Sequence, residues 1–180
     1  MSLRKKLSRI LGLEEKLAHL ECGTLAPSFT LKTYTGMQHK LASLLEEGPV
    51  VLAFFKISCP VCQFTFPFLQ RLHERLSTGR AAVIGVSQDD ARDTRDFCQE
   101  YGVQFPVLLD ESGYPVSNAY GLTNVPTIFL IDPDGKIKRE CMGFDKAALE
   151  KMTADLEERA NLPSTPLFRS DEVIPAYKPG

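Results

Sequence analysis

The spacing of apolar side chains changes along the chain, and each change predicts a different element. Near the N-terminus, leucine and isoleucine recur every three or four residues up to Leu20, which predicts an amphipathic helix that ends before Gly23. Six consecutive apolar residues, 50–55, predict a strand that is covered on both faces. Because helical stretches separate the following strands, we expect parallel pairing with right-handed crossovers.

The remaining pattern predicts a mixed sheet. Further strands are expected at 29–32, 81–87, 106–109, 127–131 and 136–142, and further helices at 41–46, from the segment after residue 59 to about 77, from 89 towards 101, and at 146–160. The sequence Asp132-Pro133-Asp134-Gly135 has proline at the first turn corner and glycine completing the turn, which predicts a β-hairpin. The far edge of the sheet is therefore expected to be antiparallel.

The pattern divides the chain into three parts. An N-terminal helical segment (1–22) precedes one α/β domain (23–160), and a tail rich in proline (161–180) follows it. The tail contains no helical or strand periodicity, so we expect it to be extended or disordered.

Composition and charge narrow the classes of partner and the compartment. With 180 residues, 43% hydrophobic, the chain can bury a core without a disulfide scaffold. A net charge of −2, with acids and bases interspersed, does not favour nucleic acid or anionic lipid. Five cysteines leave at least one thiol free, which favours a reducing compartment. The basic residues 4–6 precede an apolar stretch, 7–13, that polar residues interrupt, so we expect a cytoplasmic protein without a membrane span; a periplasmic location would require a removed leader.

A pair of cysteines supplies the chemistry. Cys59-Pro60-Val61-Cys62 lies where the apolar strand gives way to a helix, and residues three apart on a first helical turn lie on one face, close enough for a disulfide. Unpaired backbone N–H groups and the helix dipole should lower the pKa of Cys59, which we assign as the attacking nucleophile. Cys62, one turn further in, is the resolving thiol. Lys56, three residues before Cys59, is either a cation that favours the thiolate or a solvated charge at the end of the strand.

Five landmarks, in order, resemble the thioredoxin superfamily, in particular the TlpA-like and alkyl hydroperoxide reductase/thiol-specific antioxidant (redoxin) type. They are Ala26-Pro27-Ser28-Phe29, Phe54-Phe55, the CPVC sequence, Pro67 within the following helix, and Asn124-Val125-Pro126-Thr127. The resemblance covers about 23–144. It implies an α/β thioredoxin-like fold, three layers α/β/α around a central mixed sheet, with an extra N-terminal helix and an extended C-terminal tail.

The resemblance also implies how substrates dock. By it, a cis peptide bond precedes Pro126, which faces the CPVC sequence and leaves the backbone of Val125 free to pair with an extended substrate. Val125 and Pro126, with Pro60 and Val61, are the predicted substrate-binding residues. The implied partners are proteins with disulfides and an upstream reductase or thiol reductant, and no cofactor is implied.

Three positions depart from the family pattern. Ala53 stands where thioredoxins commonly carry a buried carboxylate, so proton transfer must use water or another side chain. Ser58 stands where many relatives have tryptophan. A peroxiredoxin would be expected to have threonine or serine at position 56, so Lys56 argues against that subfamily.

Two other functions stay open at the level of sequence. One is a thiol-dependent peroxidase, in which Cys59 becomes a sulfenic acid and Cys62 condenses with it. The other is a non-catalytic thioredoxin-fold module that binds protein or metal, which Ala53 would suit. No metal site is predicted, because the other cysteines and the histidines show no second paired spacing. For Cys98 and Cys141 we expect small buried side chains.

Overall fold

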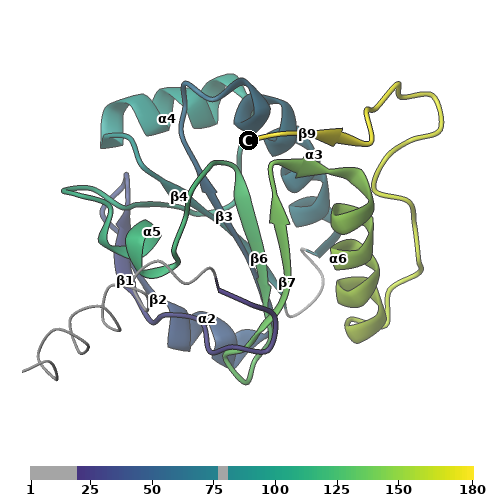
Figure 1. Ribbon diagram of the computed structural model, residues 1–180, viewed down its shortest axis with the longest axis horizontal. Coiled ribbons are helices and arrows are strands. Elements are labelled where there is room, and N and C mark those ends of the chain that lie inside the picture. The colour runs from purple at the N-terminus through teal and green to yellow at the C-terminus, as the bar shows by residue number, and fades with distance from the viewer. Residues whose placement is uncertain (1–19, 77–80) are drawn as a thin grey trace, which may run out of the picture.

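The computed structural model describes residues 20–76 and 81–180, and within them the chain forms one central sheet with helices on both faces (Figure 1). The strands are β1 (Thr30–Thr33), β2 (Gln38–Lys40), β3 (Val50–Phe55), β4 (Ala82–Ser87), β5 (Val107–Leu109), β6 (Thr127–Ile131), β7 (Ile137–Met142), β8 (Phe144–Asp145) and β9 (Tyr177–Lys178). The helices are α2 (Leu41–Glu47), α3 (Pro60–Leu76), α4 (Ala91–Glu100), α5 (Pro115–Ala119) and α6 (Lys146–Arg159). Nearly all of the N-terminal helix predicted from the sequence lies outside the described residues.

Strand β3 lies within the sheet because its sequence is apolar at every position. All six of its residues are buried, and it pairs in parallel with β4 and antiparallel with β6. The strand order of the large sheet is β2-β1-β5-β4-β3-β6-β7. The predicted mixed sheet, parallel at β3, β4 and β5 and antiparallel beyond β3, is confirmed.

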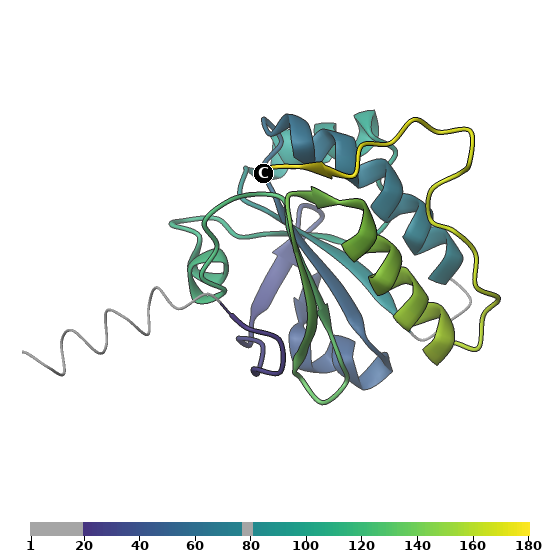
Figure 2. The same cartoon turned by 45° about the vertical axis from the view of Figure 1, so that its right-hand side comes forward.

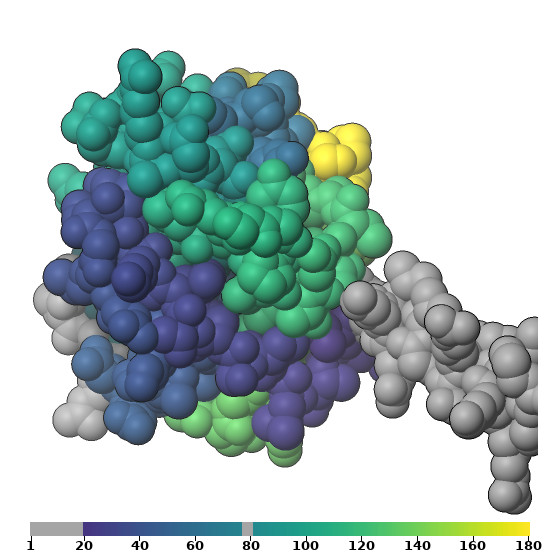
Figure 3. All heavy atoms as spheres, turned by 90° about the vertical axis from the view of Figure 1, so that its left-hand side faces the viewer, coloured from purple at the N-terminus to yellow at the C-terminus, as the bar shows by residue number. Residues whose placement is uncertain are grey.

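Two apolar clusters, one on each face of the sheet, give the molecule three layers (Figure 2). Residues of β3 alternate between them. Phe55 belongs to the cluster that contains side chains of α3, α4 and α6, and Phe54 to the cluster that contains side chains of α2 and α5. Figure 3 shows the side of the molecule where β2 and β1 form one edge of the sheet, with the purple residues of these strands beside green residues of the α5 segment.

The turn between β6 and β7 forms as the sequence predicts. The N–H of Gly135 donates to the carbonyl of Asp132 at 2.8 Å, and Gly135 has a positive φ of 81°. Pro67 lies inside α3, as predicted, with an exposed side chain. No helix within the two described stretches is long and apolar enough to cross a bilayer.

Several elements were not predicted from the sequence. Strands β2, β8 and β9 have three residues or fewer, and α5 is a single short helix after a left-handed Tyr114. The tail is the largest difference, since the sequence left open whether it is extended or disordered. It is extended and packed against the domain, with Leu167 and Phe168 buried and β9 paired with β8.

Candidate active site

The loop between β3 and α3, residues 56–59, sets the position of the first cysteine. The N–H of Ile57 donates to Asp89 Oδ2 at 2.7 Å, and the side-chain amide of Gln63 donates to the Ile57 carbonyl at 2.8 Å. The N–H of Cys59 donates to the Lys56 carbonyl at 3.2 Å. These bonds hold the loop from both sides, so Cys59 is presented immediately before the first residue of α3.

The sulfur of Cys59 is half-buried and has two hydrogen-bonding neighbours of opposite kind. It accepts from the backbone N–H of Cys62 at 3.2 Å, in the manner of an N-cap side chain. As a thiol it donates to the carbonyl of Val125 at 3.3 Å. The N–H group stabilises negative charge on the sulfur, and the carbonyl stabilises the protonated form.

Cys62 lies one turn further along α3 and is completely buried. Burial raises the pKa of its thiol far above the ordinary value, and the hydrogen bond to Cys59 raises it further. The backbone N–H of Cys62 donates to the Cys59 sulfur, and the raised pKa keeps the Cys62 thiol protonated at neutral pH. The pair is thus asymmetric, with a reachable sulfur at residue 59 and a protonated, shielded one at residue 62.

The segment before β6 closes the site from the other side. The Val125–Pro126 peptide bond is cis, and the Val125 carbonyl meets the Cys59 thiol although the two residues are 66 positions apart in the chain. The predicted cis bond before Pro126 and the predicted proximity of Val125 to the CPVC sequence are confirmed. The expectation that the Val125 backbone is free needs correction, because Gly180 lies directly against its carbonyl.

The other predicted site residues lie nearby, and their roles stay predictions. Pro60 is exposed and Val61 is half-buried, both in the first turn of α3. The ammonium of Lys56 lies over the ring of Tyr114, 5.4 Å from its centroid, which is a cation–π arrangement. Lys56 therefore has a partner that the sequence did not suggest.

Asp89 is the site residue that sequence reasoning missed. Its carboxylate holds the loop at Ile57 and is one of the negative charges that raise the pKa of Cys62. The sequence marked Asp89 only as part of a helix start, and nothing in its spacing from Cys59 indicated the contact. Ala53 is fully buried in β3, so the position where thioredoxins commonly carry a carboxylate is filled by a methyl group.

The remaining thiols have other surroundings. Cys98 and Cys141 are buried, as predicted, and burial raises the pKa of each to about 11. Cys22 is exposed. Within residues 20–76 and 81–180, no group of three or more His, Cys, Asp and Glu side chains could hold a metal ion.

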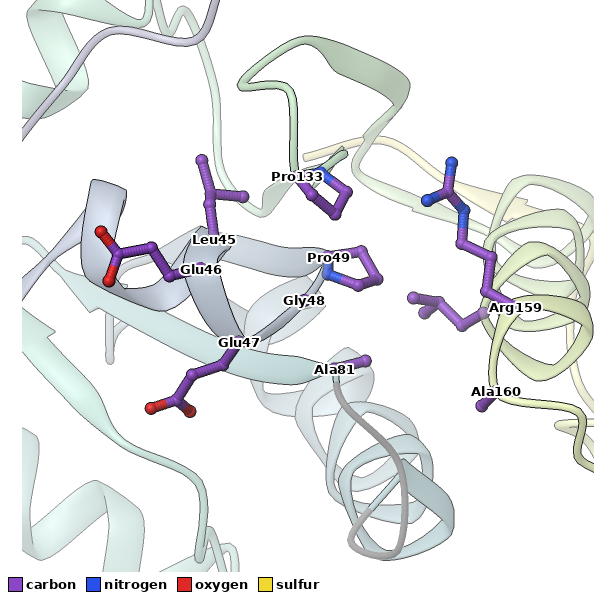
Figure 4. A pocket seen from close by; sticks show the side chains of 10 residues that line it. Leu45, Glu46, Glu47, Gly48, Pro49, Ala81, Pro133, Arg159 and Ala160 are labelled. Carbon is purple, nitrogen blue, oxygen red and sulfur yellow. The ribbon is translucent and has the colours of Figure 1, made fainter.

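A pocket of about 560 Å³ lies away from these thiols, at the start of β3 and the end of α6 (Figure 4). Pro49 and Pro133 line one side of this hollow, and the Arg159 side chain lies across from them. Arg159 donates to Asp132 at 2.7 Å. Among the described residues that line the hollow, none is a cysteine or a histidine.

Comparisons with known proteins agree with this geometry. A model of the AhpC/TSA family matches residues 22–140. The thiol-disulfide oxidoreductase ResA of Geobacillus thermodenitrificans is 30% identical over 122 residues, which are 67% of this chain and 69% of the relative.

Solved structures give the same result for the fold. The thiol:disulfide interchange protein DsbE from Chlorobium tepidum matches with a TM-score of 0.69 and 30% identity, over 76% of this chain and 98% of that chain. Peroxidoxin BcpB from Mycobacterium tuberculosis matches with a TM-score of 0.68 and 27% identity, over 78% and 98%. The predicted α/β architecture with a central mixed sheet is therefore confirmed.

Proposed function

This chain belongs to the AhpC/TSA family, and from that premise we propose that it is a thiol-disulfide oxidoreductase that reduces or exchanges disulfides in substrate proteins. One observation carries the proposal. The half-exposed sulfur of Cys59 accepts an N–H from the start of α3, while Cys62 sits behind it as a buried, protonated thiol. A reactive first sulfur and a shielded second one are what sequential attack and resolution require.

In the first step, the thiolate of Cys59 attacks one sulfur of the substrate disulfide. A bond forms between Cys59 and that sulfur, the substrate S–S bond breaks, and the other substrate sulfur leaves as a thiolate. The N–H of Cys62 is placed to stabilise the attacking sulfur before the bond forms.

In the second step, Cys62 loses its proton and attacks Cys59. The Cys59–Cys62 disulfide forms and the mixed disulfide breaks. The thiolate released in the first step takes a proton from water, so that the substrate leaves with two thiols. Because Ala53 supplies no carboxylate, we propose that the proton of Cys62 passes to the departing substrate sulfur, directly or through water. Two electrons move from the protein to the substrate, and a thiol reductant or reductase must restore the dithiol.

We assign docking to Val125 and Pro126, with Pro60 and Val61 on the other side of Cys59. The contact between the Cys59 thiol and the Val125 carbonyl supports this, because a substrate sulfur that reaches Cys59 must pass beside that carbonyl. An extended substrate segment could then add backbone hydrogen bonds at this loop. The proposed partners are proteins with accessible disulfides and a reductant of the thiol class.

We propose the cytoplasm as the compartment. The support is the odd number of cysteines and the exposed thiol of Cys22, which a reducing compartment would keep free. Fractionation of cells that express the full chain would test this, and recovery of the protein outside the cytoplasm would contradict it.

The function is tested by presenting the reduced protein with two oxidants. Insulin, as a protein disulfide, should consume the Cys59 and Cys62 thiols faster than hydrogen peroxide does. A Cys62→Ser variant should accumulate a mixed disulfide with the substrate because resolution is lost, and multiple turnovers should fall at least about a hundredfold. Cys22→Ser, which removes an exposed thiol outside the site, is the matched control and should behave as the parent does.

Two outcomes would contradict the proposed function, and each would favour one of the alternatives. If hydrogen peroxide consumes the thiols faster than insulin, the peroxidase function is the better one. If neither oxidant reacts and the cysteine variants change nothing, the non-catalytic binding module is the better one.

A further inference from the structure

The C-terminal tail returns to the redox site after crossing the helices that cover one face of the sheet (Figures 1 and 2). Its first anchor is apolar. Leu167 and Phe168 are 1% and 4% exposed, and the Phe168 ring lies 4.9 Å from Phe68 and 5.7 Å from Phe144, centroid to centroid. This part of the tail is therefore part of the core beside α3.

The second anchor is ionic. Arg71 of α3 donates to both carboxylate oxygens of Glu172, at 2.9 and 2.6 Å, and also to the carbonyl of Leu167 at 2.8 Å. Arg75 donates to the carbonyls of Thr165 and Pro166. A guanidinium bound to backbone and carboxylate together fixes the direction of the segment that follows.

Beyond these anchors the chain adds a strand at the redox end. Residues 177–178 form β9, which pairs antiparallel with β8, with Phe144 opposite Lys178. The ammonium of Lys178 lies 4.6 Å from the centroid of Phe64, one turn into α3. Gly143 is required here, because a Cβ atom on it would collide with the Lys178 carbonyl.

The last residues reach the docking loop. A Cβ atom on Gly180 would lie 2.6 Å from the Val125 carbonyl and 2.7 Å from the side-chain amide nitrogen of Asn124. The Val125 carbonyl is the same atom that accepts the Cys59 thiol. Residues 177–180, which we call the strap, therefore occupy the approach to Val125.

We propose that the strap is an internal occupant of the substrate-docking edge, and that a protein disulfide reaches Cys59 only after the polypeptide around it displaces the strap. This inference rests on the proposed function. The partner that fits is an extended segment, because the strap itself is held by strand pairing at β8 and by contact at Val125. A small disulfide, which needs no strand at this edge, is affected much less.

The strap is suited to detach from β8 and Val125 and to bind there again. Its strand has only two residues, and Tyr177 is 54% exposed, whereas the anchors at Leu167 and Phe168 are buried. Segments with few buried contacts open at a small fraction of the global unfolding free energy. The anchors keep the detached strap close, so it can compete with substrate at high effective concentration.

The experiment compares the full chain with a chain shortened by residues 177–180. The single-turnover rate of Cys59 is measured with insulin and with a small aromatic disulfide. If the strap is closed in about nine molecules of ten, its removal should raise the insulin rate about tenfold and change the small-disulfide rate less than about twofold. Glu172→Gln keeps residues 177–180 in the chain but weakens the ionic anchor. It should therefore raise the insulin rate by a smaller factor than the shortening does.

Val173→Ser is the matched control within the tail, because that side chain is fully exposed. It should leave both rates unchanged. An insulin rate that stays the same or falls after shortening would overturn the proposal that the strap covers the docking edge. An equal rise of the rate with both disulfides would also overturn it. A full chain whose Cys59 reacts with neither disulfide would instead overturn the proposed function, so the two failures are distinguishable.

Discussion

At one end of the sheet, two thiols lie under the cis-proline loop and the end of the tail, and at the other end the chain leaves a hollow of about 560 Å³. The hollow is lined by side chains such as Pro49, Pro133 and Arg159, and no described residue of its lining carries a thiol (Figure 4). The redox end has the opposite character. Its reactive atoms lie on a surface that the chain itself covers.

The comparison shows that the volume of a hollow and the presence of a reactive atom are separate properties of this molecule. A small molecule needs a concave site, but a polypeptide that adds a strand needs an edge and one reachable atom. At the redox end the edge is β8 with Val125, and the atom is the Cys59 sulfur with its N–H donor. The hollow of about 560 Å³ is therefore not where we place the proposed reaction.

The largest expected effect comes from changing one residue at each end of the sheet and asking which end carries the reaction. Cys59→Ser should lower the rate of insulin reduction at least about a thousandfold, because a hydroxyl cannot form the mixed disulfide. Arg159→Gln, at the hollow, removes a surface bond to Asp132 and should leave that rate unchanged within about twofold. Turnover of insulin by the purified variants is the measurement. A large loss in Arg159→Gln with little loss in Cys59→Ser would reverse the assignment of the two ends.

The elements at the redox end differ in how far the sequence could predict them. Strand β3 was predicted with its correct bounds because its six apolar residues fit only a strand covered on both faces. The proximity of Val125 to Cys59 came from the resemblance, since no local pattern relates residues 66 positions apart. The strap was missed because β9 has two residues and its pairing partner β8 also has two, too few for periodicity to show.

The tail illustrates the limit of composition. Its prolines fit an extended chain as well as a disordered one, and the choice depends on contacts that local sequence does not encode. Arg71 lies on α3 about a hundred positions before Glu172, its partner. Asp89 was missed for the same reason, because its bond to Ile57 depends on how the β4 and β3 ends meet.

A smaller effect tests whether the tail belongs to the core at the redox end. Phe168→Ala removes a ring that packs against Phe68 and Phe144, and it should lower the free energy of unfolding by about 3 kcal/mol. Val173→Ala, on the exposed part of the tail, should change it by less than about 0.5 kcal/mol. Urea denaturation of both variants is the measurement. Equal effects would mean that the tail adds no packing to the domain.

Acid should release the ionic anchor. Hydrogen bonds from the Arg71 guanidinium and the Arg169 N–H hold the pKa of Glu172 at about 2, below its ordinary value of 4.5. A carboxyl whose pKa is lowered by folding stabilises the folded state above its ordinary pKa, and this contribution is lost as the pH falls through the folded value. The Leu167 methyl resonances should therefore shift between about pH 4.5 and about pH 2.

The matching variant for the acid experiment is Glu172→Gln, which has no proton to gain. It should show the loosened tail at neutral pH and no further transition in the same range. If the parent's Leu167 resonances do not move in acid, the anchor does not hold the tail, and the comparison between a covered and an open end loses one of its supports.

The smallest effect concerns the cation beside the redox site. Because the Lys56 ammonium lies over the Tyr114 ring, 5.4 Å from its centroid, part of its charge is already engaged away from Cys59. Lys56→Met should therefore slow alkylation of Cys59 at neutral pH by only about twofold, since the N–H of Cys62 still stabilises the thiolate. Tyr114→Leu frees the ammonium, and Lys56 should then have a larger effect on the same rate. A tenfold loss in Lys56→Met alone would show that a charge, rather than the backbone at the start of α3, controls the thiol.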